Sequence, residues 1–162
     1  MRRRTLLAVT GGTLLGSTAG CLGGDAGENG TISVDGTSVP LVSVADAIDW
    51  YEDDDLLVLD ARSQREWEEV RIAGAEWSPA PDGRDNDPTA GVAGDGQVLT
   101  YCVCPHLLAG QRAASLIEAG FESVYALDEG LNEWIEQGYP LEGTEVTGST
   151  ASIDVREPDY HQ

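Results

Sequence analysis

The sequence contains no lysine and few basic residues of any kind, which limits what the protein can bind. Its 162 residues include nine arginines against 29 aspartates and glutamates, and the formal net charge is −20. Binding to nucleic acid and electrostatic attachment to an anionic membrane both need a basic face, so the composition argues against both. A hydrophobic content of 41% is too high for an acidic disordered chain. An acidic surface on a real core, without lysine, is typical of proteins from high-salt organisms such as haloarchaea.

The sequence also lacks a hydrophobic run long enough for a typical membrane-spanning helix. The uncharged segment 5–20 has 16 residues and is interrupted by glycines, whereas a spanning helix needs about 20 apolar residues. Three arginines precede this segment, and small residues lead to Cys21, which is the pattern of an export signal. We therefore expect residues 1–20 to be a signal peptide of the twin-arginine and lipoprotein type. An ordinary secretory signal with an incidental cysteine is the alternative.

Lipidation of Cys21 would determine where the protein is found. The mature chain would be exported and held at the outer face of the cytoplasmic membrane. One lipid-modified residue is an anchor and not a span, so we expect contact with the membrane only through this lipid.

Cysteine is scarce, which excludes a disulfide framework and a standard zinc site. The three cysteines are Cys21, Cys102 and Cys104, with neither a second cysteine pair nor a histidine pair beside them. His106 completes only a weak Cys-x-Cys-x-His cluster, so we expect no metal ion and no cofactor. A reactive thiol is the better explanation of the Cys-x-Cys pair.

Between two polar ends, the chain alternates apolar strands with helices. Residues 21–37 are rich in Gly, Asp and Asn and predict a flexible tether, and residues 143–162 predict an acidic disordered tail. Ser63 and Glu66 have the spacing of a capping box at a helix start. The predicted strands are 39–42, 56–59, 97–101 and 123–127, and the predicted helices are 43–51, 63–70, 107–119 and 129–137. The alternation predicts one α/β domain over residues 38–142, with a mostly parallel sheet covered by helices on both faces.

Cys102 is the main candidate for a reactive group, because it directly follows the buried strand 97–101. Reactive groups of parallel α/β sheets collect at the carboxyl ends of the strands. A helix that begins within a few residues would direct unpaired N–H groups and its positive dipole end at the thiol. Both favour the thiolate, and the same N–H groups can cradle an anion. The residues expected in this cradling loop are Val103, Pro105, Leu107 and Leu108. A buried structural cysteine is the alternative.

The order of the motifs resembles a rhodanese-like domain over about residues 39–142. In the first half, the apolar strand is followed by Asp60-Ala61-Arg62, the pair Glu66-Trp67 and the turn 72–75. The motifs of the second half are Tyr101-Cys102, an alanine-rich helix, Ala119-Gly120-Phe121, Val124-Tyr125-Ala126-Leu127, Gly130, Trp134 and Gly138-Tyr139-Pro140. The resemblance implies a single α/β domain of this family.

The resemblance also implies sulfur transfer. Cys102 would take sulfane sulfur from a small donor such as thiosulfate or a polysulfide and hold it as a persulfide. It would then pass the sulfur to a thiol or another nucleophilic acceptor. Asp60 and Arg62 would help to shape the site from the neighbouring strand end.

The loop after Cys102 departs from the family pattern. Typical members have Cys-x-x-Gly-x-Arg before the helix. Here the helix end at 119–121 places Cys102 one residue further away than usual, so the loop is slightly enlarged and its arginine is missing. Family phosphatases and arsenate reductases need an arginine six residues after the cysteine, where this chain has Leu108. Arg112, a possible auxiliary, lies one turn inside the helix, which makes phosphatase activity a minor alternative.

Cys104 and His106 are additional to the family pattern and leave the function open. Cys104 would be a resolving thiol if it attacked an oxidised or persulfidated Cys102. His106 would favour the thiolate as an imidazolium, or act as an acid. The alternatives to a sulfurtransferase are therefore a thiol redox or sulfur-binding module that uses Cys102 and Cys104, and a non-catalytic rhodanese-like module that binds a partner.

Overall fold

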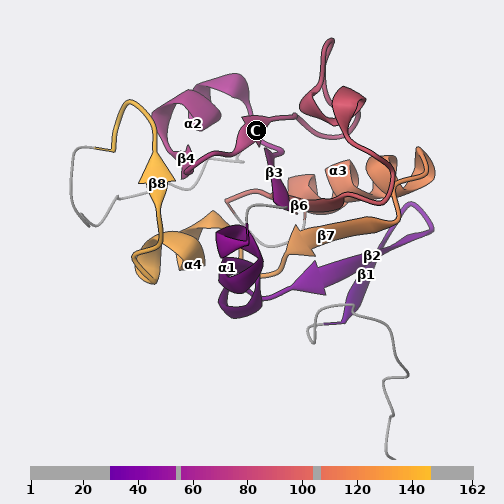
Figure 1. The fold of residues 1–162 in the computed structure, drawn as a ribbon, viewed down its shortest axis with the longest axis horizontal. Helices are drawn as coiled ribbons and strands as arrows, with labels where there is room; N and C mark the ends of the chain where they lie inside the picture. The colour runs from indigo at the N-terminus through magenta and orange to yellow at the C-terminus, as the bar shows by residue number, and fades with distance from the viewer. Residues whose placement is uncertain (1–29, 54–55, 104–106, 147–162) are drawn as a thin grey trace, which may run out of the picture.

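The apolar runs of the sequence assemble into one twisted sheet (Figure 1). The computed structural model describes residues 30–53, 56–103 and 107–146. The strands of the main sheet are β1 Thr31–Val34, β2 Thr37–Val42, β3 Leu56–Asp60, β5 Glu76–Trp77, β6 Gln97–Tyr101 and β7 Ser123–Leu127. Their order is β1-β2-β7-β6-β3-β5, and all neighbours are parallel except β1 and β2. The predicted mostly parallel α/β sheet is confirmed.

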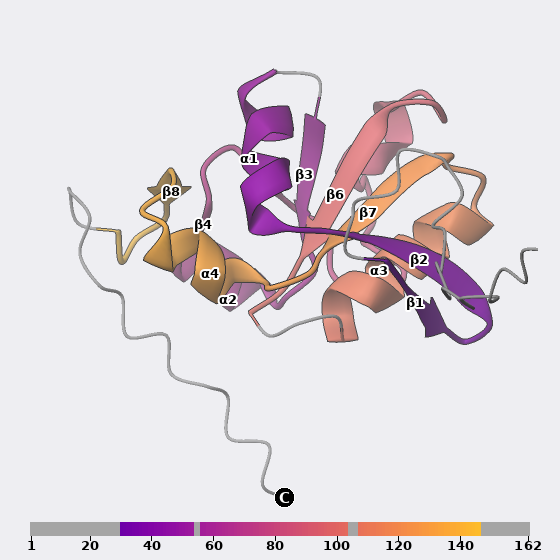
Figure 2. The same cartoon turned by 90° about the horizontal axis from the view of Figure 1, so that it is seen from below.

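Helices cover both faces of this sheet, as predicted (Figure 2). The helices are α1 Val44–Glu52, α2 Gln64–Glu69, α3 Leu107–Glu118 and α4 Leu131–Glu136, with a short 3₁₀ helix at Pro88–Gly91. Figure 2 places α3 on one face and α1, α2 and α4 on the other. None of the helices in the described ranges has the length and apolar character to cross a bilayer.

Each face of the sheet has its own apolar core, and β6 contributes to both. Leu99 and Tyr101 pack beneath α1 and α4 together with the fully buried Trp134. Val98 and Cys102 pack beneath α3. This alternation follows from the two-residue period of a strand, and it separates the surroundings of Tyr101 from those of Cys102.

The helix starts follow from local sequence. Ser63 Oγ accepts a hydrogen bond from the Glu66 N–H, and the Glu66 carboxylate accepts one from the Ser63 N–H, so the predicted capping box is confirmed. Ser43 also caps α1, because its Oγ accepts from the Asp46 N–H at 3.1 Å, without the reciprocal backbone bond of a capping box. The N–H of Val44 also donates to Glu129 Oε2 at 2.9 Å, so the loop before α4 supports the start of α1.

The predicted tether 21–37 was drawn too long, because β1 lies within it. Ile32 and Val34 face the core beneath α3, and this burial stabilises a strand where the composition had indicated a flexible segment. Asp35 and Gly36 form the turn to β2 with φ values of 49° and 93°. The ordered domain therefore begins by residue 30 and not at residue 38.

The predicted tail 143–162 was also drawn too long, because its first residues bind α2. The domain reaches β8 Leu141–Glu142, which pairs with β4 Arg71–Ile72 in a separate two-stranded sheet. Beyond β8, the N–H groups of residues 144 and 145 donate to carbonyls of α2. The rest of the tail, the signal 1–20 and Cys21 lie outside the described residues.

Candidate functional site

Cys102 lies at the carboxyl end of a central strand. β6 has β3 on one side and β7 on the other, and Cys102 directly follows its last residue, Tyr101. The residue is 2% exposed and belongs to the apolar core beneath α3. Among the residues that the structure describes, it is the only cysteine. The predicted nucleophile thus lies at the edge where parallel sheets present reactive groups, and it is buried.

A side-chain hydrogen bond joins the strand before Cys102 to the helix after it. Thr100 is fully buried, and its Oγ1 donates to the carbonyl of Ala109 at 2.9 Å. Because Ala109 lies in the first turn of α3, this bond holds the start of the helix beside the end of β6. The first N–H groups of a helix have no partner within the helix, and here they are held at the Cys102 edge.

The predicted cradling loop is apolar where the structure describes it. Val103 is 8% exposed, and Leu108 is partly buried against the core beneath α3. Leu107, the first residue of α3, is 56% exposed and is the only large hydrophobic residue exposed in the described ranges. Cys104, Pro105 and His106, the other predicted members of the site, lie outside those ranges.

Gly130, at the start of α4, supports the backbone of Cys102. The N–H of Leu131 donates to the Cys102 carbonyl at 2.8 Å. Gly130 has a φ of 79°, and a Cβ there would lie 2.6 Å from the Val103 carbonyl oxygen and 2.9 Å from that of Cys102. Both the backbone conformation and the close approach therefore require glycine.

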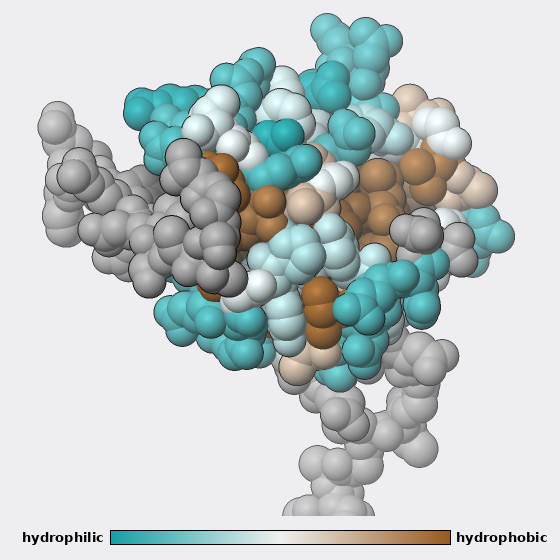
Figure 3. Space-filling view, turned by 60° about the vertical axis from the view of Figure 1, so that its left-hand side comes forward, coloured by the Kyte–Doolittle hydropathy of each residue, from teal (hydrophilic) through white to brown (hydrophobic). Residues whose placement is uncertain are grey.

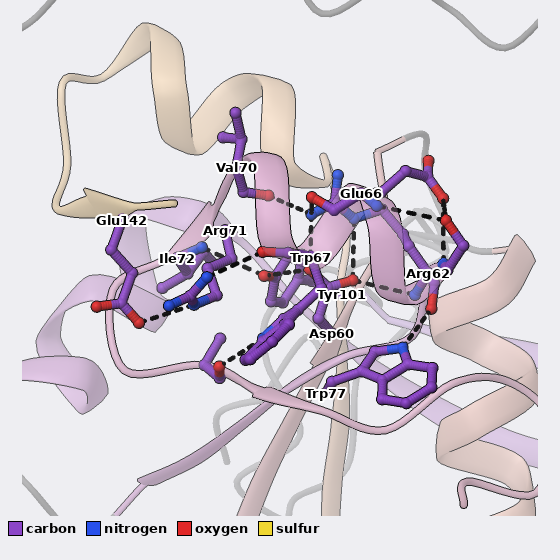
Figure 4. A network of polar contacts seen from close by, with 12 residues as sticks. Asp60, Arg62, Glu66, Trp67, Val70, Arg71, Ile72, Trp77, Tyr101 and Glu142 are labelled. Atoms are coloured by element: carbon purple, nitrogen blue, oxygen red, sulfur yellow. Dashed lines mark hydrogen bonds and ion pairs between the residues drawn. The ribbon is translucent and has the colours of Figure 1, made fainter. Parts of the chain in front are cut away.

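Asp60 and Arg62 form a buried ion pair close to α2 (Figure 4). Arg62 Nε and Nη2 donate to the two Asp60 oxygens at 2.9 and 2.6 Å, and Nη2 also donates to the Val70 carbonyl at 2.6 Å. The Tyr101 hydroxyl donates to Asp60 Oδ2 at 2.6 Å and accepts from the Ile72 N–H at 3.2 Å. This network fixes the ends of β3 and β6 to the segment that follows α2.

In this network, the positive charge of Arg62 is balanced by the negative charge of Asp60. Burial opposes the charge of Arg62, but the hydrogen bond and charge of Asp60 outweigh burial and raise the pKa of the guanidinium above its usual value. Burial, together with the Asp60 carboxylate, raises the pKa of Tyr101 well above its usual value. The phenol therefore stays protonated and keeps donating its hydrogen bond.

The site-shaping role of Asp60 and Arg62 stays a prediction, and the structure places the pair across the sheet from the core that contains Cys102. Tyr101, to which Asp60 is bonded, points into the core opposite the one that contains Cys102. The pair holds the strand ends from that opposite face. Its charges satisfy each other beneath the surface, so it offers no cation to a bound anion.

Arg112, the other predicted auxiliary, binds the long loop after β5. It is 3% exposed, and its Nε donates to Ser78 Oγ at 2.8 Å while Nη2 lies 3.2 Å from Asp87 Oδ1. Nη1 lies 3.4 Å from the Pro81 carbonyl. The guanidinium thus ties this loop to the second turn of α3, and its predicted auxiliary role at Cys102 stays a prediction.

Asp87 is the centre of this second network. It accepts hydrogen bonds from the hydroxyls of Ser78 and Thr89 at 2.7 Å each, and from the Thr89 N–H at 3.1 Å. Burial raises the pKa of its carboxyl, but these hydrogen bonds and the charge of Arg112 outweigh burial, and the pKa lies below its usual value.

The sequence did not predict the long-range contacts of the residues around the candidate site. Ser78 and Asp87 contact Arg112 across more than twenty positions of sequence, and no local pattern indicates such a pairing. The Tyr101 hydroxyl was also missed, because its neighbour Asp60 belongs to another strand. Gly130 was noted as a motif residue, but its contact with the Cys102 backbone depends on the packing of two loops.

Among the described residues, no group of three or more His, Cys, Asp or Glu side chains is placed to hold a metal ion. What they do contain is a thiol at a strand end, a helix start beside it, and apolar residues around both.

Comparisons with known proteins agree on the fold. The family profile described as the rhodanese-like domain matches residues 43–137. The structure of BH2092 from Bacillus halodurans has a TM-score of 0.57 and 24% identity, covering 70% of this chain and 85% of that one. The rhodanese-like domain of Alr3790 from Anabaena sp. has a TM-score of 0.57 and 23% identity, with coverage of 76% and 96%.

A structure described as a 3-mercaptopyruvate sulfotransferase, SseA from Escherichia coli, has a TM-score of 0.54 and 20% identity. The match covers 65% of this chain and 52% of that one. At such identities these likenesses establish the fold. No curated protein sequence matches the chain.

Proposed function

Because the chain belongs to the rhodanese-like domain family, we propose that it is a sulfurtransferase in which Cys102 carries sulfane sulfur as a persulfide. The family includes sulfurtransferases. The observation that carries the proposal is the position of Cys102, directly after the central strand β6 and a few residues before α3. A thiol in that place is next to the first N–H groups of a helix, which have no partner within the helix and favour an anionic sulfur.

The proposed reaction has two displacement steps. In the first, the Cys102 thiolate attacks the sulfane sulfur of a small donor. An S–S bond to Cys102 forms, the S–S bond of the donor breaks, and the donor remainder leaves with the electron pair. In the second, a thiol or another nucleophilic acceptor attacks the outer sulfur, and Cys102 leaves as a thiolate. Neither step needs a metal or a cofactor.

The charge of the intermediate suits the described surroundings of the thiol. A persulfide carries one negative charge at most, and the helix start can accept it without a side-chain cation. The Thr100 bond to Ala109 and the approach of Gly130 to Val103 hold the backbone on both sides of the thiol. Preorganised N–H groups are most effective where they need not move during the reaction.

The proposal is tested by sulfur loading of the full chain. The reduced protein is incubated with thiosulfate, with inorganic polysulfide and with elemental sulfur, and is then weighed intact and mapped by peptide. We expect at least one donor to add sulfur to Cys102, and the Cys102→Ser variant to lose that addition. Loss of two hydrogens that depends on Cys104 would instead identify the redox pair. No mass change with any donor would leave the non-catalytic binding module.

We also propose that the mature protein is anchored by lipid at Cys21. The proposal rests on the arginines, the short apolar segment and the small residues before Cys21. In a host with the matching export system, the wild type should fractionate with membranes and release on detergent treatment. The Cys21→Ala variant should lose this association, and a variant that stays with the membrane fraction would contradict the proposal.

A further inference from the structure

The two buried arginines, Arg62 and Arg112, bind carboxylates of the protein itself. Arg62 donates to both oxygens of Asp60 and is 4% exposed, and Arg112 binds Asp87 and is 3% exposed. A buried arginine can leave its partner only by exposing an unpaired carboxylate in the interior, which is costly. Neither residue is therefore available to a ligand.

The remaining arginines in the described ranges are engaged as well. Arg65 pairs with Glu69 within α2, and Arg71 pairs with Glu142. Arg84 donates to the Trp77 carbonyl at 2.9 Å and lies over the Trp77 ring. All five arginines that the structure describes thus have partners within the chain. Arg65 and Arg84 are exposed to solvent, but the buried pairs of Arg62 and Arg112 offer no cation to a dianion such as thiosulfate.

The described residues that follow the thiol, up to the first turn of α3, are apolar. Val103 follows Cys102, and Leu107 and Leu108 open α3. Leu108 also stands six residues after the cysteine, at the place where an oxyanion-binding loop would need a cation. Leu107 is more than half exposed, so the first turn of α3 has an apolar side chain at the surface.

The face that contains this edge is not uniformly hydrophilic. The arrowheads of β2 and β7 point to the left in Figure 1, and Figure 3 turns that side toward the viewer. Apolar side chains, drawn brown, lie there among hydrophilic ones in a protein of net charge −20. Anions are repelled by such a protein as a whole, whereas an uncharged molecule is not.

We infer that the donor to Cys102 is uncharged, apolar sulfane sulfur, such as a ring of sulfur atoms, and not an oxyanion; this inference rests on the proposed function. The thiolate of Cys102 bonds to one ring sulfur, one S–S bond of the ring breaks, and the electron pair stays on the terminal sulfur of the opened chain. No leaving group departs in this step. A thiol acceptor then attacks the sulfur bonded to Cys102, and Cys102 leaves as a thiolate.

The test compares two donors on the full chain: cyclo-octasulfur delivered in cyclodextrin, and thiosulfate. It is run at about pH 8, where an imidazole of ordinary pKa is uncharged, and at salt concentrations of about 0.1 and 1 M. High salt screens repulsion by the whole molecule but adds no fixed cation to the described part of the site. We expect ring sulfur to load Cys102 at least about tenfold faster than thiosulfate at both concentrations. Comparable loading by thiosulfate at high salt would overturn the inference.

Two variants of Leu107 separate charge from apolar character. The side chain is exposed, so neither substitution should cost much stability. Leu107→Arg should speed thiosulfate loading by about tenfold, because it adds a cation at the helix start. Leu107→Gln should slow ring-sulfur loading without any gain for thiosulfate. An unchanged preference in both variants would overturn the inference.

The same experiment distinguishes this inference from the function on which it rests. If thiosulfate loads Cys102 as fast as ring sulfur does, the donor class is wrong and the sulfurtransferase stands. If the protein is folded, as shown by cooperative melting, and no donor loads Cys102, not even inorganic polysulfide, the proposed sulfurtransferase function is wrong.

Discussion

At the scale of single residues, Gly130 is a sharp test of how the site is held. Its φ of 79° and the 2.6 and 2.9 Å from an added Cβ to the Val103 and Cys102 carbonyl oxygens mean that alanine must displace the peptides after these two residues. We expect Gly130→Ala to slow sulfur loading of Cys102 by about tenfold or more, since misplacement by about 1 Å can cost even more in rate. Loading is followed by intact mass against time.

Gly138 provides the matched control for backbone strain. Its φ is 74°, but a Cβ there would meet nothing within 4 Å. Both alanine variants should lose about 1–3 kcal/mol of stability, whereas only Gly130→Ala should impair loading. Equal loading in the two variants would show that contact with the Cys102 backbone is unimportant.

Asp87 predicts a pH dependence of stability. Its pKa is lower in the folded protein than in the unfolded chain, so its contribution is fully present above the unfolded value of about 4 and is lost as the pH falls through the folded value. Asp87→Asn should therefore destabilise the protein by about 1–3 kcal/mol near neutral pH. Urea unfolding between about pH 7 and pH 3 should show that this difference shrinks with acid. Asp85→Asn, an exposed change in the same loop, should show no such difference at any pH.

Residues could be predicted from the sequence where a local pattern determines their place. Cys102 follows an unbroken apolar run, and Ser63 with Glu66 defines a helix start, so both were found. The partners of Arg112 were not, because Ser78 and Asp87 meet it only after β5 and α3 have packed. Arg112 was considered as an auxiliary because the loop lacks the family's arginine, whereas in the structure it is buried and bound to Ser78 and Asp87.

At the scale of elements, strands and helices with strong periodicity were predicted within a few residues. The predicted strands 97–101 and 123–127 match β6 and β7 in full. β4, β5 and β8 have two residues each and exist through long-range pairing, so no window of sequence reveals them. β1 is different, because its signal was present: an alternating run ends at Asp35-Gly36, a dipeptide typical of tight hairpins.

The hairpin formed by β1 and β2 makes a prediction of its own. Ile32 lies against α3, where a Cβ on Gly110 would come within 2.9 Å of Ile32 Cδ1. Ile32→Ala should therefore destabilise the domain by about 1–3 kcal/mol in urea unfolding. Ser33→Ala, on the exposed side of the same strand, should change stability by less than about 0.5 kcal/mol. If both variants unfold at the same urea concentration as the wild type, residues 31–34 contribute nothing to stability and belong to the flexible tether.

At the scale of the whole molecule, the chain enters the fold at the edge that contains Cys102. β2 runs parallel to the central strands, and β1 runs against it, so Gly30 lies near the carboxyl end of β2, where its carbonyl accepts from the Leu41 N–H at 2.9 Å. Residues 22–29 span at most about 30 Å when extended. Lipidation of Cys21, as proposed, would hold the reactive edge close to the membrane, where apolar sulfur dissolves more readily than thiosulfate.

The net charge of −20 predicts that salt stabilises the fold. Added salt shortens the screening length from about 10 Å at 0.1 M to about 3 Å at 1 M, which weakens repulsion among carboxylates that arginine does not neutralise. We expect the free energy of unfolding in urea to rise by about 1 kcal/mol or more over this range, equally in NaCl and KCl. Glu52, the last residue of α1, places a negative charge at the negative end of the helix dipole. Glu52→Gln should therefore stabilise the protein at low salt and make little difference at high salt. If the free energy of unfolding stays constant or falls as salt is added, repulsion among the acidic residues does not destabilise the fold.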